Sequence, residues 1–452
     1  MFRRLLVANR GEVAVRIART CRRLGVKPVA VYSEADAGAP WLAHFEAAVC
    51  IGPAHPGRSY LDQEAILQAA IQQDCQAIHP GWGFLAENAL FATRVSQLRI
   101  AWVGPTPRAI RLMGDKALAR ETVAGLGLPT IPGSEGVLRD AGEAVERAAG
   151  IGFPVLLKAS AGGGGRGMRV VRSADELARA FADAGREAGA SFGDPSLYME
   201  KYIERGRHIE FQVLGDGFGN AVHLGERECS VQRRHQKLVE EAPSPVLDPR
   251  TREELGARIV HALAALGYQG AGTMEFLRDA GGALYFMEMN TRLQVEHPVT
   301  EMTTGIDIVE HQLRVAAGER LGIATGDVAW DGHAIEARIN AEDPARDFQP
   351  APGRIARFEF PADLGPGRVR IDTHIEPPAE VPPFYDSLVA KVIAHGRTRG
   401  DAIETLRRCL ATARVEGVPT TIPAHLKILA HPGFASGDYD TSLLSDRSVL
   451  ES

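Results

Sequence analysis

The chain has 452 residues, enough for two or three domains around substantial cores. Its 45% apolar and 24% charged residues are typical of an ordinary globular protein rather than a fibrous or disordered one. The net charge of −6 argues against nucleic acid as a partner, and no apolar run approaches the ~20 residues of a membrane helix.

Strands and helices are predicted to alternate at the start of the chain. Apolar runs and helical spacing predict a strand at 4–8, a helix at 12–24, a strand at 28–32, a helix at 60–71 and a strand at 77–79. This alternation is typical of a parallel sheet with helices on both faces. We therefore expect an α/β domain over residues 1–114.

A second domain is expected over residues 115–329, with a compact insert at about 130–203. Within the insert, strand-like segments flank a glycine run at 162–167. The elements predicted for this domain are strands at 154–158, 168–171, 196–199, 208–214, 221–224, 272–277 and 283–289, and helices at 175–188 and 303–317.

The glycine run can bind phosphate because bare backbone N–H groups approach oxygens closely. The Walker loop and the dinucleotide fingerprint both require strand, loop and helix, and the Walker loop ends in Gly-Lys-Ser/Thr. Here the run joins two predicted strands, and no Gly-Lys-Ser/Thr follows it. Two interpretations remain: a flexible hairpin tip, or a mobile lid that closes over a nucleotide and excludes water.

A third, α+β domain is expected over residues 330–452, with strands at 334–340, 353–359 and 387–394 and a helix at 399–415. The five cysteines of the chain are widely spaced, odd in number and without a CxxC pair. A zinc site or disulfide framework is therefore not expected, and the cytoplasm is the default compartment. The short apolar run near the N-terminus is not expected to be a signal peptide.

The segment 288–298 carries the strongest chemical signal. If it begins as a strand, Glu288 and Asn290 project to one face, and Met287 and Met289 face a core. A carboxylate beside an amide oxygen suits a hard cation such as Mg²⁺. The alternative is a charged strand end with surface ion pairs.

The same segment continues with groups that suit an anion. Arg292 can hold a small planar anion by a two-pronged hydrogen bond, and Gln294 is next in line. Glu296 could then remove a proton from that anion. The order of these residues favours a functional site over a charged surface.

Several separated motifs occur in a fixed order, at residues 8–12, 79–88, 113–116, 162–169, 226–237, 288–298, 336–344 and 385–387. With these motifs the chain resembles the biotin carboxylases of the ATP-grasp superfamily over essentially its whole length. The resemblance implies an ATP-grasp fold with an N-terminal Rossmann-like parallel-sheet domain, a mobile glycine-rich lid and a C-terminal α+β domain. The chain departs from the family pattern at Ala161, at Trp82 and in a longer 275–288 hairpin.

The resemblance also implies the reaction. Biotin carboxylases use ATP, Mg²⁺ or Mn²⁺, and bicarbonate to form carboxyphosphate, which carboxylates biotin. No Met-Lys-Met segment for biotin attachment is present, so biotin is expected on a separate biotin carboxyl carrier protein. We further expect a homodimer and a separate carboxyltransferase subunit. The final acceptor, which could be acetyl-CoA, another acyl-CoA or pyruvate, stays open.

Residue roles follow from the matched positions. The implied ATP-binding residues are Lys116, Lys158, Gly164, Gly165, Glu200, Lys201, Ile203, His208, Gln232, His235, Glu275 and Glu288. The implied metal ligands are Glu275, Glu288 and Asn290. The implied bicarbonate residues are Lys237, Arg292, Gln294, Val295 (through its backbone) and Glu296. Trp82 and Arg338 are implied for biotin.

Four of these residues are implied to be catalytic: Lys237, Arg292, Glu296 and Arg338. Glu296 would be the base, and Arg338 would stabilise the biotin enolate.

Structural alternatives stay open at this point. The lysines could be solvated surface charges and the glutamates structural ion pairs. Arg338 could simply pair with Glu336 or Asp343, and Cys229 is expected to be an inert thiol. For the whole chain, the alternatives are another ATP-grasp carboxylate–amine ligase or a non-catalytic carboxylase scaffold subunit.

Overall fold

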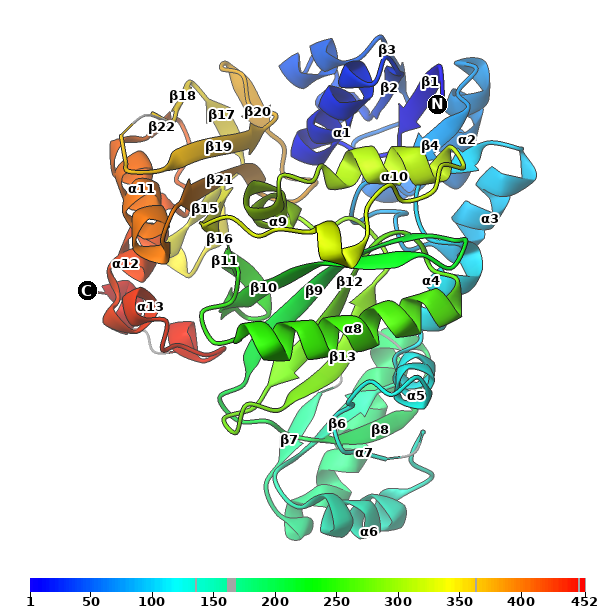
Figure 1. Ribbon diagram of the computed structural model, residues 1–452, viewed down its shortest axis with the longest axis vertical. Helices are drawn as coiled ribbons and strands as arrows, with labels where there is room; N and C mark the ends of the chain where they lie inside the picture. Colours follow the sequence, from blue (N-terminus) through cyan, green and yellow to red (C-terminus); the bar gives the residue numbers. More distant parts are fainter. Residues whose placement is uncertain (135, 161–167, 362–363, 446–447, 452) are drawn as a thin grey trace.

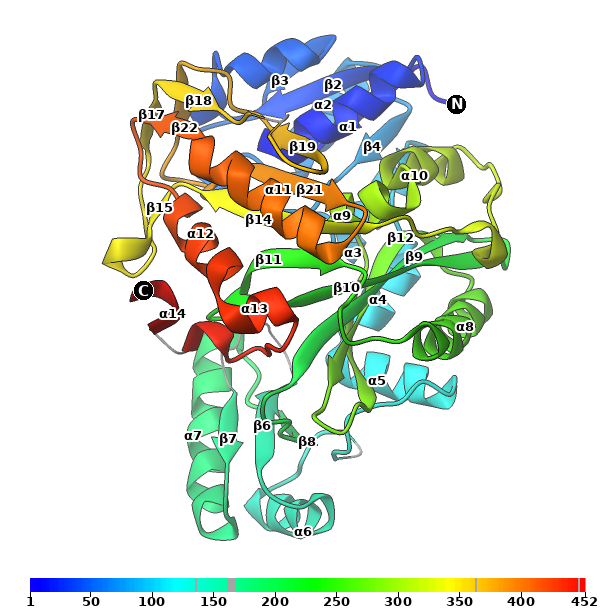
Figure 2. The ribbon, with the colours of Figure 1, turned by 60° about the vertical axis from the view of Figure 1, so that its left-hand side comes forward.

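The computed structural model describes residues 1–134, 136–160, 168–361, 364–445 and 448–451. Figures 1 and 2 show an N-terminal unit and a C-terminal unit on one side of a large central sheet, with a smaller unit projecting on the other side. Within the described ranges, no helix combines the length and apolar character needed to cross a membrane.

The N-terminal unit is a five-stranded sheet in the order β3-β2-β1-β4-β5, with every neighbouring pair parallel. Leu5 and Val7 on β1 pack in one core with α1, whereas Leu6 packs in a second core with α2 and α3. The predicted parallel sheet with helices on both faces is therefore confirmed. Its elements are β1 Arg4–Val7, α1 Gly11–Arg23, β2 Lys27–Tyr32, β3 Ala47–Cys50, α2 Gln63–Gln72, β4 Ala77–His79, α3 Ala89–Gln97, β5 Ala101–Trp102 and α4 Pro107–Gly114.

The projecting unit contains the antiparallel sheet β7-β6-β8 with α6 and α7 beside it, and α5 precedes it in the chain. β6 and β7 pair directly, so the glycine run connects two strands, as predicted. Residues 161–167, which include Ala161, Gly164 and Gly165, lie outside the described residues. The elements are α5 Lys116–Gly125, α6 Ala141–Ile151, β6 Val155–Ala159, β7 Arg169–Val171, α7 Ala174–Phe192 and β8 Leu197–Lys201.

The central sheet has eight antiparallel strands in the order β13-β12-β9-β10-β11-β14-β21-β19. Pairing between β11 and β14 joins the strands of the second and third segments into this one sheet. The elements from the second segment are β9 Arg207–Asp216, β10 Ala221–Arg233, β11 Gln236–Ala242, α8 Pro249–Leu266, β12 Gln269–Arg278, β13 Leu284–Asn290, α9 His297–Thr304 and α10 Ile308–Ala316.

The alternation along β9 separates a core face from a polar face. Ile209 and Phe211 pack with α8, which crosses one face of the sheet in Figure 1. Because neighbouring strand residues point to opposite faces, His208 and Glu210 lie on the other face. Glu210 is nonetheless fully buried, so that face is a buried polar site rather than a solvent surface.

The C-terminal unit packs α11 and α12 against β14 and β21 in one core. Its elements are β14 His333–Asn340, β15 Glu342–Asp343, β16 Gln349–Pro350, β17 Gly353–Ile355, β18 Arg357–Glu359, β19 Arg368–Thr373, β20 Ala379–Val381, β21 Leu388–Gly396, α11 Arg399–Thr412, β22 Arg414–Glu416, α12 Ile422–Ala430, α13 Pro432–Ser436 and α14 Ser448–Glu451.

Several predicted elements are wrong in extent. The helix expected at 303–317 is two helices, because Gly305 adopts a left-handed conformation with φ +72° and ends α9. The strand expected at 353–359 is two strands that pair with different partners, β20 and β22. The helix expected at 399–415 ends at Thr412, and the residues after it pair with β18 instead.

Glu241 on β11 ties the central sheet to the C-terminal helices. Its carboxylate lies 2.6 Å from His333 Nε2 and accepts a hydrogen bond of 2.7 Å from Arg399 Nε. Burial raises the pKa of Glu241, but His333 and Arg399 outweigh it and lower the pKa from 4.5 to about 2. The carboxylate thus stabilises the fold above pH ~4.5, by ~3 kcal/mol, and loses that contribution as the pH falls towards 2.

We therefore expect Glu241→Gln to lower the urea midpoint of unfolding at pH 7. The difference from the wild type should shrink as the pH falls below about 4.5, since the wild-type carboxylate then takes up its proton. Urea unfolding of both proteins at several pH values checks this. A difference that is unchanged down to the pH of acid unfolding would contradict it.

Candidate active site

The two predicted metal carboxylates face each other across the β12–β13 pair. Glu275 and Glu288 are direct cross-strand partners, and a register shift follows immediately. Met289 points into the core, as predicted, but Met287 does not belong to that core. The prediction for Met287 is wrong because the shift inserts one residue and puts Met287 out of the alternation.

Glu275 is fully enclosed by polar partners. Its carboxylate lies 3.0 Å from His208 Nε2 and 3.1 Å from Lys237 Nζ, and it accepts a hydrogen bond of 2.8 Å from the Asn290 amide. Burial raises the pKa of Glu275, but Lys237 and His208 lower it below its ordinary value. The carboxylate is therefore ionised at neutral pH.

Glu288 and Asn290 complete an oxygen-rich face beside Glu275. Asn290 presents its amide oxygen to Arg292 at 3.1 Å. Two carboxylates and an amide oxygen fit Mg²⁺, which prefers oxygen ligands and usually takes one or two carboxylates. A second group, formed by His208, Glu210 and Glu275, brings donor atoms within 4.8 Å of one another. Its histidine nitrogen makes it the less suitable set for this ion.

The two predicted phosphate lysines are not solvated surface charges. Lys116 Nζ lies 2.8 Å from Glu288. Burial lowers the pKa of Lys116, but Glu288 and Tyr198 together raise it above its ordinary value. Lys158 Nζ lies 2.5 Å from the buried Glu200, two residues beyond its direct partner Tyr198 on β8. Both ammonium groups are therefore held in place beside acidic residues.

The remaining ATP candidates are less closely gathered. The Lys201 ammonium donates to the carbonyls of Gly152 and Phe153, at 3.0 and 2.8 Å, so it is held by a loop of the projecting unit. Ile203 is half-buried just after β8. Gln232 is half-buried at the end of β10, and His235 is exposed in the turn that follows, with φ +66°.

Arg292 is held on three sides. Its guanidinium donates to Glu87 at 2.8 Å, to Gln294 Oε1 at 2.9 Å and to Asn290. Gln294 is buried, and its Nε2 has no hydrogen-bond partner in the described part of the chain. An unpaired buried donor next to a guanidinium is suited to a small anion.

Glu296 is fully buried between two cations. Its carboxylate lies 2.7 Å from Lys237 Nζ and accepts a hydrogen bond of 2.8 Å from Arg338. Burial raises the pKa of Glu296, but Lys237, Arg338 and Arg227 together hold it well below its ordinary value. The candidate base is therefore ionised at neutral pH.

Lys237 contacts both a candidate metal ligand and the candidate base. Its ammonium contacts Glu275 at 3.1 Å, Glu296 at 2.7 Å and Glu210 at 2.7 Å. Burial lowers the pKa of Lys237, but the three carboxylates raise it well above its usual range. The charged Lys237 thus connects the candidate base directly with a candidate metal ligand.

Arg338 makes neither of the structural pairs considered from the sequence. It donates to Glu240 at 2.6 Å and to Glu296. Asp343 lies 3.6 Å from Arg346, and both carboxylate oxygens of Glu336 have no hydrogen-bond partner among the described residues. Arg338 therefore faces the candidate base.

Trp82 lines a cavity of ≈290 Å³ between the N-terminal and C-terminal units, together with Tyr385 and Asp386. Its indole N–H donates to Glu12 at 3.1 Å. Arg338 is not among the residues that line this cavity, so the two residues expected to hold biotin do not share it.

The sequence reasoning missed a layer of buried charges beneath the site. Arg227 is fully buried and donates to Glu210 at 2.6 Å. The buried Glu240 holds Arg338. Arg292 is held by Glu87, which is exposed and does not belong to this layer. Arg227 and Glu87 lie within the motifs quoted above, whereas Glu210 and Glu240 lie outside them, and the contacts join separate segments of the chain. Cys229 in the same layer is fully buried, and burial raises the pKa of its thiol well above 9, in keeping with an inert thiol.

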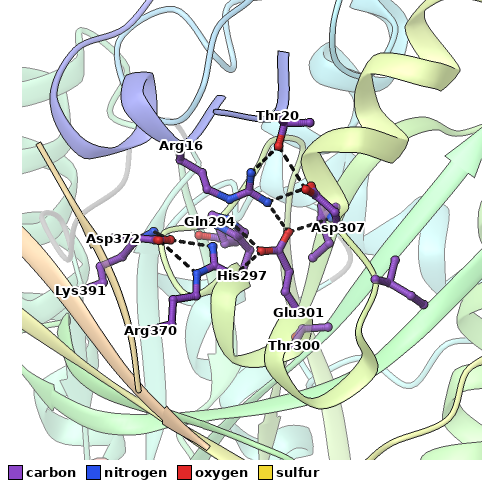
Figure 3. A network of polar contacts seen from close by, with 12 residues as sticks. Arg16, Thr20, Gln294, His297, Thr300, Glu301, Asp307, Arg370, Asp372 and Lys391 are labelled. Atoms are coloured by element: carbon purple, nitrogen blue, oxygen red, sulfur yellow. Dashed lines mark hydrogen bonds and ion pairs between the residues drawn. The ribbon is translucent and has the colours of Figure 1, made fainter. Parts of the chain in front are cut away.

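Val295 is held in place through its backbone carbonyl group. Its carbonyl oxygen accepts a hydrogen bond of 2.9 Å from Lys391, and the carbonyl of Gln294 lies 2.7 Å from His297 Nδ1. Figure 3 shows Gln294, His297 and Lys391 in a polar network in which Arg16 and Arg370 also converge on Glu301. The segment between Arg292 and Glu296 is therefore held at its side chains and at its carbonyl groups.

Comparison with protein families gives three matches along the chain. The biotin carboxylase N-terminal domain matches residues 1–110, and the ATP-binding domain of the carbamoyl-phosphate synthase L chain matches 115–324. The biotin carboxylase C-terminal domain matches residues 336–446. The matches follow one another and cover most of the chain.

Similar proteins match over their full length or nearly so. A biotin carboxylase of Nostoc sp. is 52% identical, covering 98% of this chain and 99% of the relative. A pyruvate carboxylase subunit of Methanothermobacter thermautotrophicus is 48% identical, covering 99% and 90%. The biotin carboxylase domain dimer of the Hydrogenobacter thermophilus 2-oxoglutarate carboxylase, solved with MgADP, ADP and bicarbonate, has a TM-score of 0.94 and 48% identity, covering 100% and 99%.

Proposed function

Since this chain belongs to the biotin carboxylase family, we propose that the residues around Glu296 carry the reaction of that family. The protein has the ATP-grasp fold and is an ATP-dependent ligase that carboxylates biotin, the first half-reaction of a biotin-dependent carboxylase. The role of each side chain in this reaction is proposed below from its contacts.

The observation that carries the assignment is the Lys237 ammonium shared by Glu275 and Glu296. Glu275 belongs to the proposed nucleotide and metal face, and Glu296 is the proposed base. A direct ionic link between them supports the proposal that bicarbonate binds beside the phosphate that it attacks. Positioning of this kind can supply a large part of a rate enhancement.

The proposed roles follow the contacts. Arg292 and Gln294 bind bicarbonate, the guanidinium by paired hydrogen bonds and the amide through its unpaired Nε2. Glu296 accepts the bicarbonate proton, so that the oxygen can attack the γ-phosphate. Arg338 then stabilises the negative oxygen of deprotonated biotin. The Lys116 and Lys158 ammonium groups neutralise phosphate oxygens.

A magnesium ion would be held by Glu275, Glu288 and Asn290. When bound, Mg²⁺ neutralises charge that develops on the transferring phosphoryl group. The chain's own contribution is to keep Glu275 ionised and to hold both carboxylates as cross-strand partners.

The assay that tests the function is ATP hydrolysis by the purified protein with Mg²⁺. We expect hydrolysis that requires bicarbonate, is stimulated by free biotin and yields carboxybiotin from labelled bicarbonate. Hydrolysis that depends on a carboxylate and an amine would point to another ATP-grasp ligase. Absence of turnover with every substrate would point to a scaffold subunit.

Replacing Glu275 by glutamine should weaken the use of Mg²⁺. Removing one of the two carboxylates should raise the Mg²⁺ concentration for half-maximal activity at least about tenfold. Even residues that only orient metal ligands change metal affinity by that factor when they are replaced. Titration of bicarbonate-dependent hydrolysis with Mg²⁺ measures this. Glu254→Gln, on the exposed face of α8, is the matched control. An unchanged Mg²⁺ requirement would remove Glu275 from the metal site.

We propose that biotin is delivered by a separate carrier protein and that a carboxyltransferase completes the reaction. The relative named as a pyruvate carboxylase subunit supports a multi-subunit enzyme. The relatives are named for different carboxylases, so they do not identify the final acceptor of the carboxyl group. Assays with the native partner proteins would identify it and would test a role in fatty acid biosynthesis.

We also propose a homodimer, because the Hydrogenobacter domain was solved as one. Light scattering of the purified protein tests it. The division into domains at 1–114, 115–329 and 330–452 is supported by the neighbouring family matches. A cytoplasmic location is a further proposal, which cell fractionation tests.

A further inference from the structure

Lys391 in the middle of β21 is a fully buried lysine that the assigned roles do not use. Its Nζ lies 2.9 Å from the carbonyl oxygen of Val295, 3.1 Å from Glu12 Oε2 and 3.9 Å from Asp372 Oδ2. Glu12 belongs to α1, Asp372 to β19, and Val295 to the segment before α9. One ammonium group thus joins all three parts of the chain.

The register of the sheet places Lys391 beside a catalytic candidate. Lys391 and Arg338 are direct partners across the β14–β21 pair. Arg338 reaches the carboxylate of Glu296, while Lys391 reaches the carbonyl of Val295. Two cations from neighbouring strands therefore hold two consecutive residues of the site.

Glu12 extends this contact to the cavity wall. One of its carboxylate oxygens lies near Lys391, and the other accepts the hydrogen bond from the Trp82 indole at 3.1 Å. Glu12 is itself buried, and both it and Trp82 line the ≈290 Å³ cavity. The ion pair between Lys391 and Glu12 therefore lies between the Val295 backbone and Trp82.

A buried ion pair is costly to desolvate and is often no more stabilising than apolar side chains of similar volume. Apolar residues in its place, however, could not hold a carbonyl oxygen and an indole N–H. The neighbouring carbonyl of Gln294 is also held, by His297, as Figure 3 shows. Both carbonyl groups of the Gln294–Val295 segment are thus fixed in direction.

We propose that Lys391 is a positioning residue: through Val295 it fixes the backbone that presents Gln294 and Glu296, and through Glu12 it fixes Trp82. The inference rests on the proposed function, because it takes this segment as the bicarbonate site and Trp82 as part of the biotin site. Lys391 itself need not touch either substrate.

Lys391→Met tests the proposal because it should change the KM values for bicarbonate and biotin but not the KM for MgATP. The lost hydrogen bond involves a charged donor, so we expect the KM for bicarbonate to rise about ten- to a hundredfold. The KM for free biotin should also rise, because Trp82 loses its support. The KM for MgATP should stay within about twofold, since Lys116 and Lys158 lie on elements that Lys391 does not contact.

Two further proteins make the result decisive. Lys27→Met removes an exposed lysine that pairs with Glu46, and it should leave all three constants unchanged. The double variant Lys391→Met/Glu12→Gln leaves no unpaired Glu12 charge, and it should show the same rise in the bicarbonate KM even where the single variant folds poorly. Thermal unfolding and active-site titration report the folded fraction.

The outcomes are distinguishable. An unchanged bicarbonate KM in the folded variants, or equal changes in all three constants, would overturn the positioning role. A lower thermal midpoint with normal constants would show that Lys391 serves stability alone. If the wild type itself lacks bicarbonate-dependent hydrolysis, the proposed function fails, and the positioning role fails with it.

Discussion

Replacing Glu296 by glutamine is expected to lower the kcat for bicarbonate-dependent ATP hydrolysis by about 10²- to 10⁴-fold, the range for loss of a general base. The glutamine keeps the shape of the side chain but cannot accept the bicarbonate proton. Lys237 retains Glu210 and Glu275, and Arg338 retains Glu240, so neither cation is left without a partner. The fold and the nucleotide face should therefore survive.

Single-turnover and steady-state hydrolysis, with MgATP binding measured separately, check this expectation. MgATP affinity should change by no more than about threefold, a difference of under 1 kcal/mol. Glu226→Gln, which alters a buried carboxylate paired with Arg252, is the matched control for loss of a buried charge. Retention of more than about a tenth of the wild-type kcat would show that Glu296 is not the base.

Replacing Arg338 by glutamine is expected to reduce biotin carboxylation by about 10²- to 10³-fold, the typical effect of losing one oxyanion donor. Burial lowers the pKa of Arg338, but Glu240 and Glu296 raise it above its ordinary value, so the wild-type group is a permanent cation. Burial already raises the pKa of Glu240 to about 7, and without Arg338 that carboxyl can stay protonated. The variant should therefore fold.

In this variant the rate of ATP hydrolysis and the rate of biotin carboxylation should be affected to different extents. Hydrolysis without biotin should fall far less than carboxybiotin formation, because Glu296 keeps its contact with Lys237. Both rates can be measured on one preparation from ADP release and from labelled carboxybiotin. Equal losses in the two rates would assign Arg338 to bicarbonate activation rather than to biotin.

Local sequence was enough for the regular parts of the fold. The strand at 77–79 and the helix at 12–24 were predicted closely, because apolar spacing alone determines which face is buried. β10 was predicted only to residue 224, although it continues to Arg233. Its later residues include Glu226 and Arg227, which are charged yet buried. Their partners, Arg252 on α8 and Glu210 on β9, lie on other elements, so the hydrophobic pattern could not show this part of the strand.

The site was predictable where the signal lay within one segment. Arg292, Gln294 and Glu296 follow one another, and the structure gathers them with Lys237. The supporting residues were not predictable in this way. Lys391 is 96 positions from Val295, and only the β14–β21 register brings it beside Arg338.

The proximity of bicarbonate to the γ-phosphate can be tested with ¹⁸O-labelled bicarbonate. If deprotonation by Glu296 lets bicarbonate attack ATP, the phosphate released during biotin carboxylation will carry a single ¹⁸O, detectable by mass spectrometry. Short reactions limit exchange of the label with water. Phosphate without ¹⁸O, formed at the same rate as carboxybiotin, would mean that water and not bicarbonate attacks ATP, and would contradict the roles assigned to Glu296, Lys237 and Arg292.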